Sequence, residues 1–458
     1  MVFNYDASDP LAVVTAPPPN ELPQDKAARE EREAEAQRIS DQIDEEISAD
    51  KAALREKEQT VKILLLGQSE SGKSTTLKNF RMRFARDKWA QERASWRTVI
   101  QLNLVRYVNT IFEALQQEIN DENEEDPILL ADKHHLLKAR LRPLRGVEQD
   151  LKRLLGAKPD EVDTPPRTSP RGSPRASSEF FVRSWNWRDF LQASRNGDSS
   201  RLSPRHDVSS HHVTEVIAGC KDDIKALWED NVIQEMLRRR RVRLEDSASF
   251  FLAASERLTA RDYEPTDDDI VRARLRTLDI QEHELSVDDD GERQKWKIYD
   301  VGGSRTQRNA WLPYFDQVNA IIFLAPISCF DERLQEDPRV NRLEDSFILW
   351  KAICSSKLLS RTTLIIFLNK IDLLEKKIES GIMVNRYLPS YADRPNETTS
   401  VVKYLRQKFK DTLSCIFPRA DIMNTDCSGP KNTRTTAQTL LSVRDGILRE
   451  HLKKANLV

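Results

Sequence analysis

The sequence predicts an α/β fold built on a doubly wound, mostly parallel sheet, with a long helical segment inserted after the first strand and helix. Two observations predict it. Apolar runs are nearly continuous, as in parallel strands covered on both faces, at 61–66, 320–324 and 363–368, and a further strand pattern lies at 295–299. Helical patterns alternate with the later strands, at about 342–357, 398–417 and 436–454.

Bulk composition narrows the class of protein. The 458 residues are too many for one core and enough for two or three domains. The 72 basic and 74 acidic residues nearly cancel, so no overall charge attracts nucleic acid or an anionic membrane. No apolar run reaches the ~18 residues that span a bilayer, and the first residues resemble neither a signal nor a transit peptide. The five cysteines are far apart, which predicts reduced thiols in a cytoplasmic protein.

The N-terminal part divides into two segments by composition. Residues 1–23 are rich in proline and are predicted to be disordered. Residues 24–58 mix acidic, basic and alanine residues without glycine or proline, which predicts a long charged helix. Ile39, Ile43 and Ile47 form a narrow apolar stripe on it. A solvated helix and a partner-docking helix both fit this pattern.

The helical segment is expected to contain an insertion of low complexity at about 122–212. Within it, 164–178 is dominated by proline, serine and arginine, a composition that buries too little apolar area to fold. The histidine pairs His134-His135 and His211-His212 lack ligand partners at metal spacing and are expected at the surface.

A glycine-rich loop follows the first strand. Gly67, Gly72, Lys73 and Ser74 fit the pattern G-x-x-x-x-G-K-[ST], with a helix predicted from Lys73. Glycines let backbone N–H groups surround phosphate oxygens, the lysine adds a positive charge, and the serine hydroxyl can bind Mg²⁺. Strand, loop and helix occur in the required order, so the loop is predicted to bind phosphate.

Two later strand ends carry matching motifs. Asp300-Val301-Gly302-Gly303 places a carboxylate where it can hold Mg²⁺ through water, beside a glycine that lets a backbone N–H reach a terminal phosphate. Asn369-Lys370-Ile371-Asp372 fits N-K-x-D, whose carboxylate accepts hydrogen bonds from N1–H and the 2-amino group of guanine. Adenine lacks both donors, so this motif disfavours an ATPase or kinase.

With these motifs in place, the chain resembles a heterotrimeric G-protein α subunit, as a divergent, fungal-like member, over about 24–120 and 213–458. Further resemblance lies in Leu227-Trp228, Asp246-Ser247-Ala248, Tyr263-Glu264-Pro265-Thr266, Asp269-Ile270 and Trp311. The resemblance implies a Ras-like P-loop GTPase domain formed by 59–81 and 271–458. It also implies an all-helical domain at 82–270 and a partner-binding helix at 24–58.

The resemblance also implies roles for individual residues. Ser74 and Thr277 are implied Mg²⁺ ligands, and Arg274 is the implied arginine that stabilises charge on the transferring phosphoryl group. The residues alone do not choose among Arg272, Arg274 and Arg276. The other implied GTP or GDP contacts are Glu70, Ser71, Gly72, Lys73, Thr75, Asp246, Ser247, Val271, Arg272, Asp300, Gly303, Asn369, Lys370, Asp372 and Asn424.

Partners follow from the same resemblance. It implies a G-protein β/γ dimer, a seven-helix receptor that contacts the C-terminus, and an effector that the sequence does not name; nucleic acid is not expected. Val2 stands where the family carries an acylated glycine, and no cysteine lies near the N-terminus. The protein is therefore expected in the cytoplasm, reaching the inner face of the plasma membrane through partners.

Two departures from the family pattern concern hydrolysis. Ser304 replaces the glutamine that orients the attacking water, and Ser69 replaces a loop glycine. Both predict slow hydrolysis, and neither removes nucleotide binding. Leu278, Asp279 and Asn424 also depart from the family pattern near the nucleotide. An alternative is a GTP-binding scaffold that does not hydrolyse GTP and presents the 122–212 insertion to partners.

Overall fold

In a computed structural model of the chain, the elements form two separate units, residues 1–60 and 61–458. The structure describes residues 22–120, 130–155, 181–182, 205–240, 242, 244, 247–277, 280–289, 292–316, 318–334, 336–360, 362–416, 423–426 and 444–447. Among the helices in these ranges, none is both long and apolar enough to cross a membrane.

The described part of the first unit forms one long helix, α2 (Pro23–Gln59). Pro23 stands at its first position, where the missing N–H costs no helical hydrogen bond. Its polar side chains pair along the helix, as in the Gln37 Nε2 to Asp41 Oδ1 hydrogen bond of 2.8 Å. Ile39, Ile43 and Ile47 are exposed on it. The apolar stripe that the sequence predicts is therefore a surface feature of this helix.

The second unit is organised around a six-stranded sheet with the order β4-β5-β1-β6-β7-β8. β1, β5, β6, β7 and β8 run parallel, and β4 pairs antiparallel with β5 at one edge. The strands are β1 (Val61–Gly67), β4 (Gln281–Asp289), β5 (Glu292–Asp300), β6 (Ala320–Pro326), β7 (Thr363–Asn369) and β8 (Met423–Asp426). The predicted doubly wound, mostly parallel sheet is confirmed.

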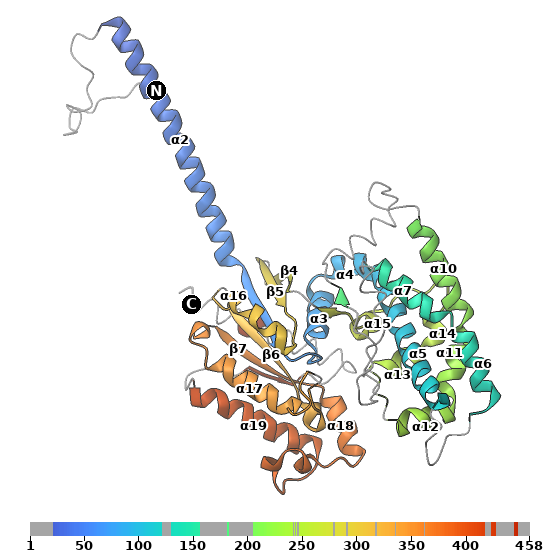
Figure 1. The fold of residues 1–458 in the computed structure, drawn as a ribbon. Coiled ribbons are helices and arrows are strands. Elements are labelled where there is room, and N and C mark those ends of the chain that lie inside the picture. The colour runs from blue at the N-terminus through green and yellow to red at the C-terminus, as the bar shows by residue number, and fades with distance from the viewer. Residues whose placement is uncertain are drawn as a thin grey trace. The chain divides into compact units, whose positions relative to one another are not determined.

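Helices cover both faces of this sheet, which explains the unbroken apolar strands. Successive side chains of β1 alternate between faces: Leu64 and Leu66 join one core, and Ile63 and Leu65 join the other. The first face packs against helices later in the chain, and Figure 1 shows α17 and α19 along it. The second face packs against α3, with Phe80 fully buried.

The remaining elements of the sheet region connect these strands. They are α3 (Lys73–Phe84), η2 (Arg305–Trp311), α16 (Leu312–Phe315), η3 (Ile327–Asp331), α17 (Arg342–Cys354), η4 (Lys357–Leu359), α18 (Ile371–Glu379), η5 (Val384–Arg386), η6 (Pro389–Tyr391) and α19 (Thr398–Ile416). The predicted helix at 436–454 is described only at 444–447, where the chain is helical.

A helical region with its own core lies between α3 and the second half of the sheet. α5 is its centre, contacting α7, α12 and α13. The elements are α4 (Arg86–Glu92), η1 (Arg93–Ser95), α5 (Trp96–Asn120), α6 (Asp132–Leu141), α7 (Leu144–Leu154), α10 (Arg205–Gly219), α11 (Lys221–Glu229), α12 (Asn231–Arg239), α13 (Ala248–Ala253), α14 (Ser255–Leu258) and α15 (Asp267–Arg272). Two short strands, β2 (Phe181–Val182) and β3 (Arg276–Thr277), pair with each other in parallel. The exact domain limits stay a prediction.

Two local expectations need correction, and a third falls outside the described residues. Residues 132–154 do not have the low-complexity character expected of 122–212, because α6 and α7 pack Leu141, Val147 and Leu151 into the helical core. The segment 164–178 lies outside the described residues. His134, expected at the surface, is buried, with Nε2 3.3 Å from a carboxylate oxygen of Asp230.

Phe323 offers a test of the sheet core. It is fully buried in β6, with its ring centroid 5.1 Å from that of Trp350 on α17. Phe323→Ala is expected to lower the free energy of unfolding by about 3–5 kcal/mol, because it leaves a cavity between sheet and helix. Denaturant titration followed by tryptophan fluorescence measures this, with Leu358→Ala at an exposed position as the control. Equal losses in the two variants would contradict the packing described.

Candidate functional site

The glycine-rich loop joins β1 to α3 at the carboxyl edge of the sheet. Gly67 and Gly72 have φ of 144° and 100°, backbone conformations that residues with a side chain rarely adopt. Because α3 begins at Lys73, the free N–H groups of its first turn and the positive end of its dipole face the loop. This local geometry suits a bound phosphate group.

The ammonium group of Lys73 lies inside the loop. Its Nζ donates hydrogen bonds to the carbonyl oxygens of Gly67, at 2.9 Å, and Gln68, at 2.7 Å. Burial lowers the pKa of Lys73 to about 8, although the carboxylate of Asp300 acts in the opposite direction. At neutral pH the group therefore keeps its proton and holds a positive charge in the loop.

The loop helix and β5 bring together a hydroxyl and a carboxylate. Ser74 Oγ donates a hydrogen bond of 2.8 Å to Oδ2 of Asp300, which is buried at the end of β5 beside Leu65 of β1. Such hard oxygen donors are the ligands that Mg²⁺ prefers, and Mg²⁺ takes its other ligands from water and phosphate. Within the described ranges there is no cluster of three or more His, Cys, Asp or Glu for another kind of metal. The two side chains fit Mg²⁺.

At Gly303 the segment after β5 lies in direct contact with the backbone of the loop. A Cβ built on Gly303 would lie 2.5 Å from the carbonyl oxygen of Gln68 and in equally forbidden contact with the backbone nitrogen of Ser69. Trp311 supports this corner by donating a hydrogen bond of 3.0 Å to the Gly302 carbonyl. Only a glycine allows the two backbones to approach this closely.

The side chain of Ser304, the residue just before η2, turns toward that helix. Its Oγ lies 3.1 Å from Oγ1 of Thr306 and donates a hydrogen bond of 2.8 Å to Oε1 of Gln307. The Gln307 side chain, which the sequence did not single out, lies against Gly302. At the position where the resemblance implies a water-orienting side chain, this protein therefore carries a hydroxyl that is hydrogen-bonded to residues of η2.

Arg274 reaches the loop from the helical region. Its guanidinium forms an ion pair with Glu70 of the loop. Arg272 instead pairs with Asp268 at 3.0 Å and covers the ring of Phe250. Of the three candidate arginines, Arg274 thus contacts the loop and Arg272 points to the helical region, while nothing is described of the Arg276 side chain.

Two residues missed by the sequence reasoning hold the backbone of Arg274 and of the segment just before it. Asn103 of α5 donates to the Arg274 carbonyl at 2.8 Å and accepts from its N–H at 2.6 Å. Lys78 of α3 donates to the carbonyls of Ile270, at 3.0 Å, and Ala273, at 2.5 Å. Both side chains are buried in the structure, but burial is not visible in the sequence, so no sequence signal pointed to them.

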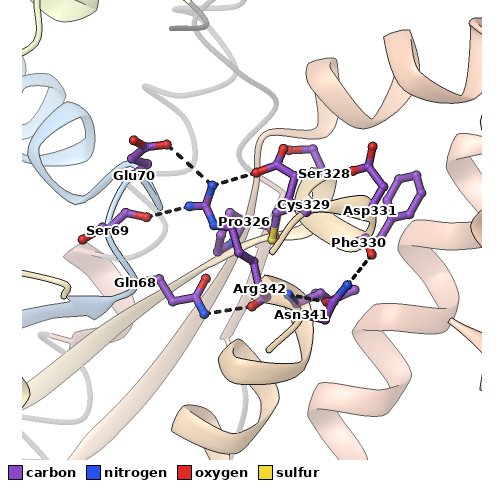
Figure 2. A network of polar contacts seen from close by, with 12 residues as sticks. Gln68, Ser69, Glu70, Pro326, Ser328, Cys329, Phe330, Asp331, Asn341 and Arg342 are labelled. Atoms are coloured by element: carbon purple, nitrogen blue, oxygen red, sulfur yellow. Dashed lines mark hydrogen bonds and ion pairs between the residues drawn. The ribbon is translucent and has the colours of Figure 1, made fainter. Parts of the chain in front are cut away.

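Glu70 also belongs to a second chain of charges, which Figure 2 shows. Arg342 of α17 lies 3.5 Å from a Glu70 carboxylate oxygen and donates a hydrogen bond of 2.8 Å to the carbonyl of Ser69. It also pairs with Glu332 at 2.7 Å, and Lys377 of α18 pairs with the same carboxylate at 2.8 Å. Burial acts to raise the pKa of Glu70, but Arg274 and Arg342 outweigh it and hold that pKa at about 2.

Asp345 connects the loop to η2 from the opposite side. Its buried carboxylate accepts hydrogen bonds of 2.5 Å from Gln68 Nε2 and 2.5 Å from Arg308 Nη2. Burial acts to raise the pKa of Asp345, but the hydrogen bonds from Arg308 and Gln68 outweigh it and lower the pKa. The carboxylate is therefore a fixed negative charge shared by the loop, η2 and α17.

The end of β7 carries the motif predicted to bind the base. Asn369 Nδ2 donates a hydrogen bond of 2.8 Å to the carbonyl of Ser71, which ties the motif to the loop. Lys370 adopts a left-handed conformation, with φ of 65°, and α18 starts directly after it. Asp372 lies half-buried in the first turn of α18, and Asn424 pairs through its backbone with Ile366 of β7.

The other predicted contacts are placed as follows. Thr75 lies half-buried in the first turn of α3, and Val271 is buried in the helical core. Ser247 lies near Tyr107, 3.0 Å between the two hydroxyl oxygens, in the helical region. Thr277 is described by its backbone in β3, and Asp246 lies outside the described residues.

Loop, strand-end carboxylate and N-K-x-D motif meet at one edge of the sheet, which defines a nucleotide-binding switch domain of the P-loop class. The chain belongs to the G-protein alpha subunit family, whose sequence model matches residues 37–447. Members of this family are guanine-nucleotide-binding signalling switches and GTPases that generally pair with β/γ dimers and receptors. The resemblance drawn from the sequence is confirmed.

Curated relatives cover nearly the whole chain. The chain is 31% identical to the guanine nucleotide-binding protein alpha-4 subunit of Mycosarcoma maydis, over 100% of this chain and 97% of that protein. It is 28% identical to the alpha-2 subunit of Neurospora crassa, with coverage of 92% and 96%. It is 27% identical to the alpha-1 subunit of Saccharomyces cerevisiae, again with coverage of 92% and 96%.

The Glu70 contacts predict a pH-dependent stability. The pKa of Glu70 falls from 4.5 to about 2 on folding, so its ionised form contributes stability that is full above 4.5 and is lost as the pH falls through about 2. Glu70→Gln is expected to lower the melting temperature at pH 7, and its difference from wild type should shrink as the pH approaches about 3.5. Thermal melts at constant ionic strength measure this, with the exposed Glu344→Gln on α17 as control. A difference that does not change with pH would argue against the ion pairs.

Proposed function

We propose that this chain is a GTP- and Mg²⁺-dependent switch that hydrolyses GTP slowly. The observation that carries the slow rate is the Ser304 side chain, which is hydrogen-bonded to Thr306 and Gln307 within η2. Serine is also shorter than glutamine and lacks the carboxamide that would reach a water molecule. Losing a water-positioning group costs on the order of 10²-fold in rate, about 3 kcal/mol of barrier.

The residues of the loop would bind the phosphates. The backbone N–H groups at the start of α3 and the Lys73 ammonium face the loop interior, while Ser74 and Asp300 offer oxygen ligands to Mg²⁺. Bound Mg²⁺ would neutralise charge on the β- and γ-phosphate oxygens. Gly303 places the backbone that follows β5 in contact with the loop, where its N–H can approach the terminal phosphate.

Arg274 would supply the positive charge that hydrolysis requires. In its present position it pairs with Glu70 rather than pointing at a phosphate. The γ-phosphate carries more negative charge than one carboxylate, so bound GTP competes for this guanidinium. Arg342 stays beside Glu70 and compensates its charge when Arg274 leaves. Moving the Arg274 guanidinium from the Glu70 carboxylate to the phosphate then costs little free energy, because neither anion is left without a cation.

Asp372 would select guanine. Its position in the first turn of α18 follows Asn369 and Lys370, and Asn369 holds this segment against the loop through Ser71. A carboxylate that accepts two hydrogen bonds from guanine is left unpaired by adenine, which carries a desolvation cost. GTP and GDP are therefore the proposed ligands.

Partners are proposed from the family together with the exposed stripe on α2. Ile39, Ile43 and Ile47 give that helix an apolar face suited to a β/γ dimer. A seven-helix receptor would contact the C-terminal residues, and the effector is unnamed. The proposed location is the cytoplasm, with contact to the inner face of the plasma membrane through these partners.

Ser304→Gln tests the slow rate directly. The variant is expected to hydrolyse GTP about 10-fold or more faster than wild type in a single-turnover assay, because its carboxamide can hold the attacking water. Binding of GTP should change by less than about twofold, since the loop is untouched. A wild-type rate equal to that of ordinary family members would refute the proposal. GTP binding without turnover in either protein would favour the scaffold alternative.

Asp372→Asn tests base selection. The amide presents N–H donors to the donors of guanine, so GDP affinity is expected to fall by about 10²-fold or more, as loss of two charge-assisted hydrogen bonds predicts. Competition of labelled GDP with unlabelled GDP and ADP measures both affinities. Glu375→Gln, exposed on the same helix, is the matched control. Unchanged preference for guanine in Asp372→Asn would remove this residue from the base site.

A further inference from the structure

We infer that β2 positions the segment that carries Thr277, and that it thereby slows the release of bound nucleotide. β2 lies within the 122–212 stretch, which the resemblance to the family does not cover. It pairs in parallel with β3, with Phe181 opposite Arg276 and Val182 opposite Thr277. The inference rests on the proposed function, because it concerns the segment beside the proposed nucleotide and Mg²⁺ site.

β3 lies between two segments that are fixed at the site. Before it, Asn103 holds the N–H of Arg274, at 2.6 Å, and its carbonyl, at 2.8 Å. After it, β4 begins at Gln281, which pairs with Asp300 at the end of β5. One residue of extended chain spans at most about 3.6 Å, so the Cα of Thr277 lies within about 11 Å of that of Arg274 and about 14 Å of that of Gln281. The chain therefore runs here from the arginine that contacts the loop to the strand beside the proposed metal ligand.

Main-chain contacts hold this segment and leave the Arg274 side chain able to exchange partners. Lys78 donates hydrogen bonds to the carbonyls of Ile270, at 3.0 Å, and Ala273, at 2.5 Å, just before the arginine. β2 continues this series of contacts after the arginine. The two strands form a sheet that is separate from the six-stranded one, so within the described part of the chain β2 is the strand that aligns β3.

Pairing with β2 favours the extended conformation of β3. Strands pair through main-chain N–H and C=O groups, so β2 can bind Arg276 and Thr277 only while their backbone is extended. β2 belongs to the same chain and lies in sequence between α7 and α10, which contact each other in the helical region. The pairing is therefore intramolecular, which gives β2 a high effective concentration at β3.

The consequence for a bound nucleotide follows from the position of the segment. It borders the site at both ends, through Glu70 of the loop and Asp300 of β5, so the site opens when the segment moves away. That movement has to break the pairing with β2. One or two main-chain hydrogen bonds of ordinary net strength change such an equilibrium by about 5-fold or more.

Thr277 gives the pairing a role toward Mg²⁺ as well. The resemblance assigns its hydroxyl to the metal, and its backbone is one of the two residues of β3 that β2 aligns. A ligand binds a metal well when the backbone that carries it is already held in place. Loss of the pairing is therefore expected to weaken Mg²⁺ binding in the presence of a GTP analogue.

The test uses the full-length chain and changes the backbone of β2. Phe181→Pro/Val182→Pro removes both N–H groups of β2 and fixes φ at about −65°, away from the value of about −120° in a parallel strand. The matched control, Phe181→Val/Val182→Ile, keeps both N–H groups and the preference for a strand. With a non-hydrolysable GTP analogue and Mg²⁺ bound, hydrogen exchange at Arg276 and Thr277 is expected to be about 5-fold or more faster in the proline variant alone.

Release of the labelled analogue measures the consequence for the site. The proline variant is expected to release it about 5-fold or more faster than wild type, and the control to stay within about twofold. The Mg²⁺ concentration that gives half-maximal slowing of release should rise in the proline variant, because Thr277 is less well positioned. The melting temperature without nucleotide should change by less than about 2 °C, since β2 lies outside the two cores of the sheet.

Several outcomes would overturn the inference. They are unchanged hydrogen exchange, unchanged or slower release in the proline variant, and equally fast release in the control, which would assign the effect to side chains. Faster exchange that extends equally to the buried strand β6 would mean a general loss of folding, and would count against it too. Hydrolysis at the ordinary family rate would refute only the slow rate, because release of the analogue does not depend on hydrolysis. Failure of the wild type to bind the analogue would refute the proposed function itself.

Discussion

The close contact between Gly303 and the backbone at Gln68 and Ser69 is the constraint on which the rest of the site depends. It brings the end of β5 against the end of β1, and it holds only because parallel neighbours β1 and β5 finish at the same edge. Ser74 then lies within hydrogen-bonding distance of Asp300, and η2 starts beside the loop. The two hydrophobic cores that cover the faces of the sheet keep these strand ends in register.

Charge compensation is the second theme of the structure. The charges alternate in sign from the helical region to the helix that follows the base motif, in the order Arg274, Glu70, Arg342, Glu332 and Lys377. Partly buried charges are stable only when each has partners of the opposite sign, so removing one member affects its neighbours on both sides. Elsewhere at the loop, the buried carboxylate of Asp345 is compensated by Arg308 and also accepts a hydrogen bond from Gln68.

The sequence predicted the features that local patterns encode. Strand-end motifs at Asp300 and Asn369 could be placed because an apolar run, a turn and a helix stand next to each other in the chain. β4 was missed, because QEHELSVDD is too polar to read as a strand until β5 pairs with it. Asn103, Lys78 and Arg342 were missed for a different reason. Their partners lie far away in sequence, and no spacing rule links a residue of α5 to the carbonyl of Arg274.

Gly302 and Gly303 divide the site into parts that can diverge at different rates. A side chain at either position collides with the loop backbone or with the Gln307 amide. The backbone at these two glycines, which includes the proposed contact to the terminal phosphate, therefore tolerates few substitutions. The groups proposed to set the rate of hydrolysis, at positions 274 and 304, are side chains, and each can be exchanged singly. Evolution can thus lengthen the lifetime of the active signal in such a chain while its two states, and the ligand that separates them, stay the same.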